Sequence, residues 1–412
     1  MKLYEYVNDC FRRYGCKKVF GVPGSLIMPI WQNIEDNTEI VLCSHEQEAS
    51  YIAVGYGKST RNLVGVITIG SPGVTNCISG LASSNIDSVP LIYISGRTPI
   101  SENGCGVRQE ESIYNRKFDS NDLLHSVTKK SVCVDCVETA SEKISEAFEC
   151  ALSGRCGCVH ISIPLDLQEK EIPKGKLHEI KRFRHVLMTH IESRPLIIMG
   201  WGCWMANAAD EVYRLSEVIG APILVTSKAY CCIESNHPFY LGKLGYGYAP
   251  QIKTFLDSYR PDQILIFGSS LGEKDINGDI EDYLKSTKIC AWGNDLEMIK
   301  KKYPCAILCK TTNMADDIKK LTHNNIGRII EHHVIEAISR TKKEICKYWE
   351  DKIESRDFMA KAIKLINEIP GNIVVTADAG NHLLNAGALL FPKSVGNLFI
   401  DVGIRSMGSG LC

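Results

Sequence analysis

Short apolar runs rich in β-branched residues alternate along the chain with longer segments of helical periodicity. The apolar runs occupy residues 63–69, 91–95, 158–163, 196–199, 222–226, 264–267, 373–376 and 397–401. Residues 138–153 and 207–219 show the spacing of amphipathic helices. Buried strands separated by helices are typical of parallel sheets covered on both faces. The pattern therefore predicts an α/β fold built from doubly wound parallel sheets.

Two charged stretches, residues 169–184 and 339–356, interrupt this alternation and indicate domain boundaries. We predict three consecutive domains at residues 1–170, 185–335 and 355–412. The last segment is too short for a complete doubly wound domain, which has at least twice its length. The third domain is therefore predicted to be incomplete.

The composition excludes several classes of partner. The chain of 412 residues carries 47 basic and 48 acidic residues, so it shows no basic surface typical of nucleic-acid binding. No apolar run reaches the ~20 residues that span a bilayer. The N-terminus has no apolar leader segment, so the 18 cysteines predict reduced thiols in a cytoplasmic protein. Cys133 and Cys136 form a CxxC pair without a second ligand pair, which favours small packed residues over a metal site.

Glu46 lies at the junction between an apolar run at residues 40–42 and a helical segment at residues 49–56. A carboxylate at such a junction is able to occupy an apolar crevice and to donate or accept a proton there. The alternative is a solvated residue at the start of a helix.

A glycine-rich turn follows the apolar run at residues 63–69, with the sequence Gly70-Ser71-Pro72-Gly73. Glycine lets the backbone approach a ligand closely, and a following helix offers free N–H groups. The alternative is a strand-to-helix turn of the kind that any α/β protein needs.

An ordered series of motifs in the first domain carries a family resemblance. The series is Phe20-Gly21-Val22-Pro23-Gly24, His45-Glu46-Gln47, Gly70 to Asn76, Asp87-Ser88-Val89-Pro90, Arg108-Gln109-Glu110 and His160 to Gln168. In order and spacing it resembles the pyrimidine-binding domain of thiamine-diphosphate enzymes of the acetolactate synthase family. The resemblance implies the fold of that family, with three doubly wound domains.

The later segments resemble the other two domains of the family. Pro195 to Gly202 and Leu241 to Gly245 match the central domain, but the stretch that binds flavin in some members is replaced, so FAD is not expected. Thr376 to His382 and Ser406 to Leu411 resemble the start of the diphosphate-binding domain, although Arg405 stands where a small residue is usual. The Gly-Asp-Gly and later Asn that hold Mg²⁺ in the family do not follow. We therefore identify no metal ligand and expect a truncated or fragmentary third domain.

The resemblance implies decarboxylation and carboligation of a 2-keto acid, with thiamine diphosphate and Mg²⁺ as cofactors. In that reading Glu46 activates the cofactor through its pyrimidine ring, and Gln109 lies near the reacting carbon. The implied cofactor-binding residues are Pro23, Gly24, Glu46, Pro72, Gly73, Asn76, Gly380, Asn381, His382, Ser406 and Met407. Lys129 is interpreted as a surface lysine.

The resemblance also implies a homodimer or homotetramer, with a small 2-keto acid as substrate. Two alternatives remain open. One is a decarboxylase of the same family with a specialised substrate, and the other is a non-catalytic relative that lacks the Mg²⁺ ligands.

Overall fold

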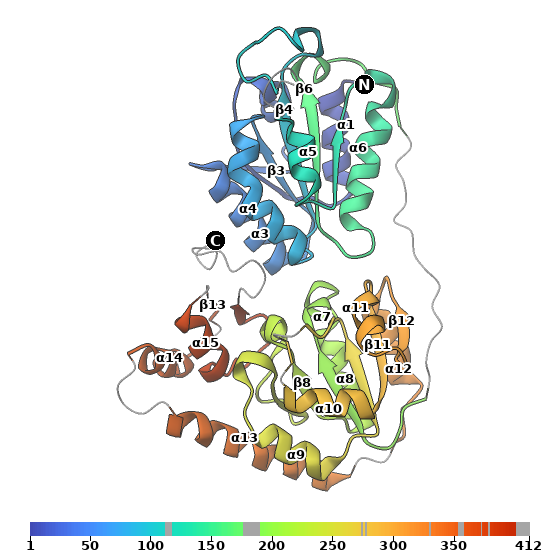
Figure 1. Cartoon of the computed structure of the whole chain (residues 1–412), viewed down its shortest axis with the longest axis vertical. Helices are drawn as coiled ribbons and strands as arrows, with labels where there is room; N and C mark the ends of the chain where they lie inside the picture. The colour runs from blue at the N-terminus through green and yellow to red at the C-terminus, as the bar shows by residue number, and fades with distance from the viewer. Residues whose placement is uncertain are drawn as a thin grey trace. The chain divides into compact units, whose positions relative to one another are not determined.

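The structure is a computed structural model that describes residues 1–111, 118–175, 190–272, 275–276, 278–328, 331–352, 358–371, 373–377 and 380–400. The chain divides into two compact units, with the boundary between Lys181 and Arg182. The described residues form two six-stranded sheets and a small two-stranded sheet (Figure 1). None of the described helices is both long enough and apolar enough to span a bilayer.

The first unit is a parallel sheet with the strand order β2-β1-β3-β4-β6-β5. Its strands are β1 (Lys18–Val22), β2 (Glu39–Leu42), β3 (Val64–Thr68), β4 (Leu91–Arg97), β5 (Lys130–Cys133) and β6 (Cys158–Pro164). Its helices are α1 (Leu3–Arg13), α2 (Met28–Gln32), α3 (Glu46–Thr60), α4 (Pro72–Ile86), α5 (Ser120–His125) and α6 (Val137–Leu152). Apolar residues of α1 and α6 pack on one face of the sheet, and those of α3 and α4 pack on the other. The fully buried strands β3 and β6 read as continuous apolar runs because both of their faces are covered.

The second unit is built on a parallel sheet of order β12-β11-β10-β7-β8-β9. Its strands are β7 (Pro195–Met199), β8 (Ile223–Val225), β9 (Tyr240–Lys243), β10 (Gln263–Phe267), β11 (Lys288–Gly293) and β12 (Ile307–Lys310). Its helices are α7 (Trp201–Met205), α8 (Ala209–Ile219), α9 (Gln251–Tyr259), α10 (Gly278–Ser286), α11 (Glu297–Lys302) and α12 (Met314–His323). Apolar residues of α8 and α12 cover one face, and those of α9, α10 and α11 cover the other.

The remaining elements of this unit pack onto the same sheet. They are α13 (His332–Lys352), α14 (Phe358–Glu368), β13 (Val375–Ala377), α15 (Asn381–Leu389) and β14 (Leu398–Ile400), with β13 and β14 paired in parallel. Ala377, Leu383 and Leu398 belong to the apolar cluster that also contains residues of α8. The segment predicted as a third domain thus shares a core with the second sheet, and the three-domain division stays a prediction.

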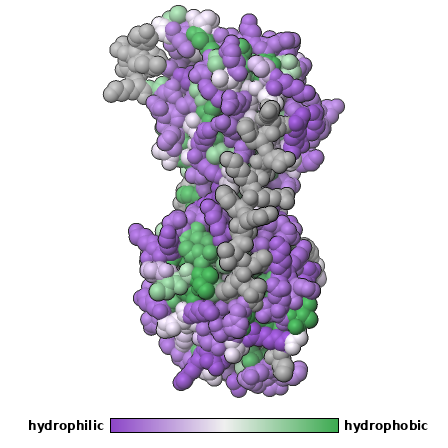
Figure 2. All heavy atoms as spheres, turned by 90° about the vertical axis from the view of Figure 1, so that its right-hand side faces the viewer, coloured by the Kyte–Doolittle hydropathy of each residue, from purple (hydrophilic) through white to green (hydrophobic). Residues whose placement is uncertain are grey.

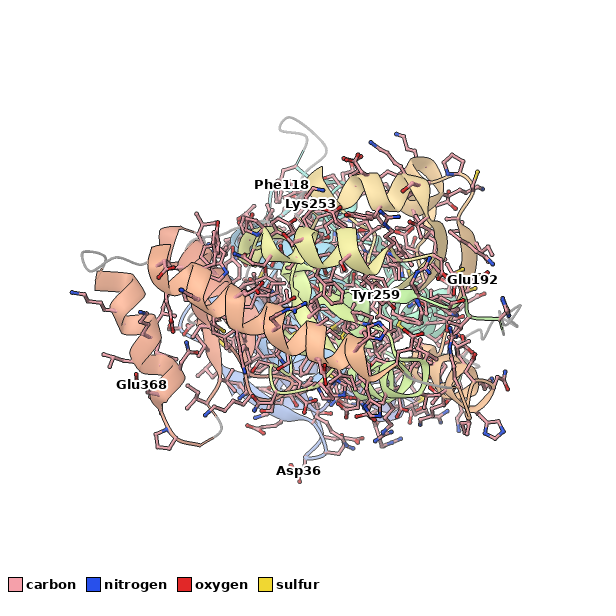
Figure 3. The ribbon with its side chains drawn as sticks, turned by 90° about the horizontal axis from the view of Figure 1, so that it is seen from below. Asp36, Phe118, Glu192, Lys253, Tyr259 and Glu368 are labelled. Carbon is pink, nitrogen blue, oxygen red and sulfur yellow. The ribbon has the colours of Figure 1, made fainter. Side chains whose placement is uncertain are left out.

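The α/β architecture predicted from the sequence is confirmed, and each predicted apolar run contains a strand. The prediction missed β1, β5, β9, β11 and β12. Each of these strands mixes apolar residues with polar residues or glycine. Most of the charged stretch at residues 339–356, which the sequence indicates as a domain boundary, belongs to helix α13. Figure 3 shows α13 lying beside α9, on which Lys253 and Tyr259 are labelled. Ile338 and Ile345 of α13 are buried in the core, so a helix with many charges on its outer side also covers the second sheet.

Figure 2 shows one face of the molecule, on which hydrophilic residues predominate and hydrophobic residues gather in smaller areas.

Candidate cofactor site

Three neighbouring strands of the first sheet end at the same edge. Leu42 of β2 pairs with Gly21 of β1, and Val22 of β1 pairs with Thr68 of β3. The segments that follow these strands therefore meet, which brings Glu46 to the same edge as Pro23–Gly24 and the Gly70 turn. Chain connections leave β1 and β3 in opposite directions, and the crevice at such a point is where open α/β sheets bind ligands.

Glu46 is the first residue of α3, and its side chain is half-buried. Its Oε2 accepts a hydrogen bond of 2.9 Å from Nδ2 of Asn76, and its carbonyl oxygen accepts one of 3.3 Å from the Cys77 thiol. His45 caps the helix, because its Nδ1 accepts a hydrogen bond from the Gln47 backbone N–H. The carboxylate is thus held in place through one oxygen, and a carboxylate has a second oxygen that can accept a hydrogen bond from a ligand. The structure thus brings Glu46 and Asn76, two of the predicted site residues, into contact.

The close approach of α3 and α4 makes that hydrogen bond possible. Ser50 lies one turn after Glu46, and Gly80 lies one turn after Asn76. A Cβ atom at Gly80 would lie only 2.0 Å from Ser50 Oγ and 3.0 Å from the Ser50 backbone carbon. Glycine at this position therefore sets the helix separation directly below the Glu46–Asn76 contact.

The turn after β3 is strained and closely packed. Ser71 has φ +48° and stands at the N-cap of α4, with Pro72 in the first helical position. A Cβ at Gly70 would lie 2.2 Å from the Gly96 carbonyl oxygen, and one at Gly73 would lie 2.7 Å from Thr68 Oγ1. Both positions therefore favour glycine, which lets the backbone of the turn pack closely against β3 and β4.

Pro23 and Gly24 follow β1 and pack against this turn. A Cβ at Gly24 would lie 2.6 Å from Cδ1 of Ile69, the residue that precedes Gly70. The two turns predicted to contact a cofactor are therefore next to each other.

Gln109 reaches the same turn through its backbone. It has φ +65°, and its carbonyl oxygen accepts a hydrogen bond of 3.1 Å from Ser71 Oγ. This contact places the residue beside the first turn of α4, where the sequence predicted a role close to the reacting atoms.

Glu111 is a buried residue that the sequence reasoning did not single out. Its carboxylate accepts hydrogen bonds from the Ser71 N–H at 3.2 Å, the Ser120 N–H at 3.0 Å and the Ser120 hydroxyl at 2.6 Å. Arg97 at the end of β4 lies 3.9 Å away and supplies an opposite charge. Glu111 thus joins the turn after β3 to the start of α5. In the sequence, only the motif that contains the neighbouring Gln109 pointed to this segment.

The second unit contains the other predicted cofactor residues that fall within the described part of the chain. Gly380 has φ +135° and is the N-cap of α15, which begins at Asn381. The paired ends of β13 and β14, Ala377 and Ile400, lie at the same edge of the small sheet. The side chains of Asn381 and His382, and all of Ser406 and Met407, lie outside the described residues.

Two family descriptions match the chain in the order of its two large sheets. Residues 1–119 match "Thiamine pyrophosphate enzyme, N-terminal TPP binding domain", and residues 189–318 match "Thiamine pyrophosphate enzyme, central domain". Curated relatives with acetolactate synthase names align with the chain as well. The chain belongs to the thiamine-diphosphate-dependent enzymes of the acetolactate synthase family.

Three relatives show how far the similarity extends. The probable acetolactate synthase large subunit of Methanocaldococcus jannaschii is 24% identical over 440 residues, covering 100% of this chain and 72% of that protein. The acetolactate synthase isozyme 2 large subunit of Escherichia coli K12 is 31% identical over 257 residues, covering 58% of this chain and 45% of that protein. The chloroplastic acetolactate synthase of Arabidopsis thaliana is 28% identical over 440 residues, covering 99% of this chain and 62% of that protein.

A solved structure shows the same fold. A Mycobacterium smegmatis protein assigned to the thiamin diphosphate-dependent enzymes superposes with a TM-score of 0.74 at 16% identity, covering 100% of this chain and 78% of that chain. The fold expected from the family resemblance is therefore confirmed.

Two further sequence-based interpretations concern residues of the first unit. Lys129 was interpreted as a surface lysine, but it is half-buried, and its ammonium donates hydrogen bonds to the carbonyl oxygens of Cys150 and Ser153 at the end of α6. The positive charge lies beside carbonyl oxygens at the C-terminal end of α6, where the helix dipole favours a cation. Cys133 and Cys136 are half-buried and contact Arg97 and Thr139, respectively. Among the described residues, no three His, Cys, Asp or Glu side chains converge on a possible metal position.

Proposed function

We propose that the protein carries out thiamine-diphosphate-dependent decarboxylation and carboligation of a 2-keto acid, of the acetolactate synthase type. The observation that carries the proposal is the half-buried Glu46 carboxylate, which Asn76 holds at the carboxyl edge of β2, β1 and β3. The acetolactate synthase names of the curated relatives support the reaction class.

The residues of the first unit fit the aminopyrimidine end of thiamine diphosphate. A carboxylate is the acceptor that a protonated ring nitrogen requires, and Glu46 is fixed in that role by Asn76. Gly24 and Gly73 pack closely against Ile69 and Thr68, which holds the turns after β1 and β3 next to each other. When bound, the cofactor supplies the carbon that adds to the keto group and accepts the electrons left by CO₂.

The chain's own residues have defined tasks in this proposal. Glu46 holds a proton on the pyrimidine ring, and Asn76 orients the Glu46 carboxylate. Gln109, anchored through Ser71, contacts the substrate side of the crevice. The α15 N-terminus after Gly380 offers N–H groups suited to a phosphate, and Mg²⁺ is proposed as the ion that neutralises the diphosphate.

A homodimer or homotetramer is part of the proposal. It rests on the resemblance to the thiamine-diphosphate enzymes of the acetolactate synthase family, which implies such an assembly. Sedimentation equilibrium of the purified chain measures the assembly directly.

The test compares the wild-type chain with Glu46→Gln in the presence of thiamine diphosphate, Mg²⁺ and pyruvate. The expected result is acetolactate formation that falls by about a hundredfold or more in Glu46→Gln, since proton handling contributes about that much to catalysis. Glu39→Gln in the exposed part of β2 is the matched control, and we expect it to keep wild-type activity.

Two outcomes would contradict the proposal. Acetaldehyde in place of acetolactate would indicate a decarboxylase of the same family. A wild-type chain that shows no saturable calorimetric binding of the cofactor with Mg²⁺, and forms neither product, would indicate a non-catalytic relative.

A further inference from the structure

A cavity of about 250 Å³ lies in the second unit. It is enclosed by the edge strand β9, the charged helix α13 and the end of α15. The charged, thiol and aromatic side chains that line it are Tyr240, Lys243, Lys342, Cys346, Trp349 and Phe391. Its volume is slightly below the ~300–1,000 Å³ typical of drug-sized ligands, so it suits a smaller molecule.

Lys243 is the most deeply buried charged group of this cavity, with an exposed fraction of 3%. Its ammonium donates a hydrogen bond of 2.8 Å to the Gly387 carbonyl oxygen and a second one to the Leu390 carbonyl oxygen. It also lies 4.7 Å from the ring centre of Phe391. These contacts satisfy a cation only in part, because an ammonium has three donors and the carbonyls and the ring carry no full negative charge.

Lys342 adds a second cation on the facing helix α13. Its ammonium donates a hydrogen bond of 3.2 Å to the His237 carbonyl oxygen. Burial lowers the pKa of Lys342, and it lowers the pKa of Lys243 to about 7, with the Cys346 thiol acting against both shifts. None of the described residues that line the cavity is acidic. The buried Lys243 and the half-buried Lys342 thus line one cavity that has no carboxylate among its lining residues, and a buried amine is costly unless it is paired.

Trp349 supplies a further donor. Its indole Nε1 is buried and has no hydrogen-bond partner among the described residues, whereas buried donors are normally satisfied. The indole ring itself adds an apolar wall to the cavity.

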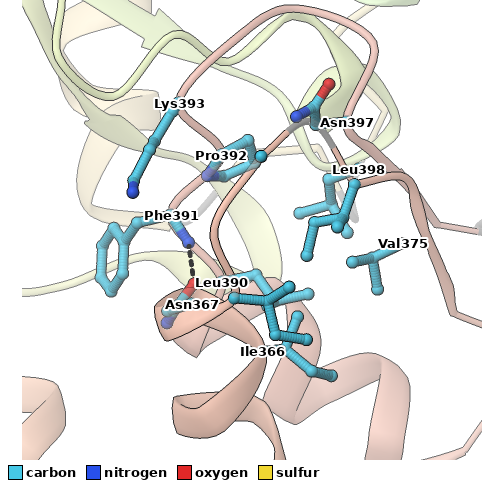
Figure 4. Close-up of a pocket in the computed structure, with 12 residues that line it drawn as sticks. Ile366, Asn367, Val375, Leu390, Phe391, Pro392, Lys393, Asn397 and Leu398 are labelled. Carbon is cyan, nitrogen blue, oxygen red and sulfur yellow. Dashed lines mark hydrogen bonds between the residues drawn. The ribbon is translucent and has the colours of Figure 1, made fainter.

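Phe391 forms a second apolar wall, and its position is fixed by Asn367 of α14. Asn367 accepts a hydrogen bond of 3.2 Å from the Phe391 N–H and donates one of 2.8 Å to the Leu389 carbonyl oxygen. Figure 4 shows the first of these bonds, with the Phe391 ring on the opposite side from the aliphatic residues Ile366, Leu390 and Leu398. The ring therefore points away from the small sheet, and its contact with Lys243 places it at the cavity.

We propose that this cavity is a binding site for a small apolar carboxylate, whose anionic group is held by Lys243, Lys342 and the Trp349 N–H. The apolar part of the molecule packs between the rings of Trp349 and Phe391. Binding supplies the negative charge that the cavity lacks and a partner for the unsatisfied indole N–H. The site is separate from the proposed catalytic crevice and does not rest on the proposed function.

Isothermal titration calorimetry of the whole chain with phenylacetate tests this site. We expect saturable binding with one site per chain. The neutral analogue 2-phenylethanol has a similar apolar body without the charge, and we expect it to bind at least about tenfold more weakly. Inorganic phosphate carries the charge without the apolar body and is also expected to bind at least about tenfold more weakly.

Variants on α13 locate the site. Lys342→Met keeps the length of the side chain and removes its charge, and we expect it to weaken phenylacetate binding by about tenfold or more. Trp349→Phe keeps a ring without the N–H donor and is expected to weaken binding by about fivefold. Lys347→Met, on the exposed side of the same helix, is the matched control and leaves binding unchanged.

Four results would each overturn the proposal. They are the absence of phenylacetate binding to the wild-type chain, equal affinity for 2-phenylethanol, equal affinity for phosphate, and unchanged affinity in Lys342→Met. Equal affinity for the alcohol would indicate a merely apolar cavity, and equal affinity for phosphate would indicate a site for bare anions.

Discussion

The contact between α3 and α4 allows a quantitative test of how the candidate site is held. Gly80→Ala would place a Cβ 2.0 Å from Ser50 Oγ, 2.5 Å from Ser50 Cβ and 3.0 Å from the Ser50 backbone carbon. The Oγ can rotate away, but the Cβ and the backbone carbon cannot. The two helices must therefore separate, and the hydrogen bond between Glu46 and Asn76, one turn above, must lengthen.

The expected cost follows from two opposing effects. Overpacking of a well-packed interior costs about 1–3 kcal/mol, whereas alanine is favoured over glycine in a helix by ~1 kcal/mol. Because the clash involves immobile atoms, we take the upper end of the overpacking range, which leaves a net loss of about 2 kcal/mol. Such a loss raises the population of the locally opened state roughly 30-fold.

A compensating variant separates this clash from other effects of the substitution. Ser50→Gly removes both Oγ and Cβ and leaves only the contact of 3.0 Å to the backbone carbon. In the double variant, alanine at position 80 occupies the space that Ser50 vacates. We therefore expect a stabilising coupling energy of about 2 kcal/mol between the two substitutions.

Hydrogen exchange of backbone amides in α3 and α4, followed by mass spectrometry of the whole chain, measures these changes locally. Gly80→Ala should accelerate exchange in both helices, and the double variant should largely restore protection. If the two substitutions prove additive, the close contact at Gly80 does not set the helix separation and the reasoning is refuted.

Three further predictions concern other buried contacts of the first unit. Burial lowers the pKa of His160 from 6.5 to about 3, so the unfolded chain takes up a proton below pH ~6.5 that the folded chain does not, and stability falls as the pH drops. In His160→Gln, the loss of unfolding free energy between pH 7 and pH 5 should be smaller by about 2 kcal/mol, measured by urea titration; equal losses would contradict it. Lys129→Met should cost about 1–2 kcal/mol by removing a charged donor from the carbonyl oxygens of Cys150 and Ser153 at the end of α6, with faster amide exchange confined to that helix turn; unchanged exchange would argue against capping. Glu111→Gln should cost about 2 kcal/mol, because an amide replaces a charged acceptor of three hydrogen bonds; a urea midpoint equal to that of the wild-type chain would speak against the role of Glu111.

Several elements were predictable because their signals are local. Strands such as β3, β6 and β10 are buried on both faces, so their apolar runs stand out from the surrounding sequence. The strands that the prediction missed lie mostly at or next to sheet edges or contain polar residues, as β9 does with Lys243. That lysine is buried because α13 and α15 pack over it. The residues around Lys243 in the sequence do not predict this packing, because both helices lie much further along the chain.

The sequence by itself determined the α/β class, the family resemblance and the identity of the catalytic candidates Glu46 and Gln109. The class follows from buried parallel strands, which impose apolar runs on the sequence, whereas the two candidates follow from the family resemblance of the motifs that contain them. Only the tertiary structure decided which side chains meet, since contacts such as Asn76 with Glu46, Glu111 with Ser71 and Lys243 with the carbonyl oxygen of Gly387 join residues 30 to 144 positions apart. Such distant contacts depend on strand order and helix separation, which are properties of packing and not of any single segment.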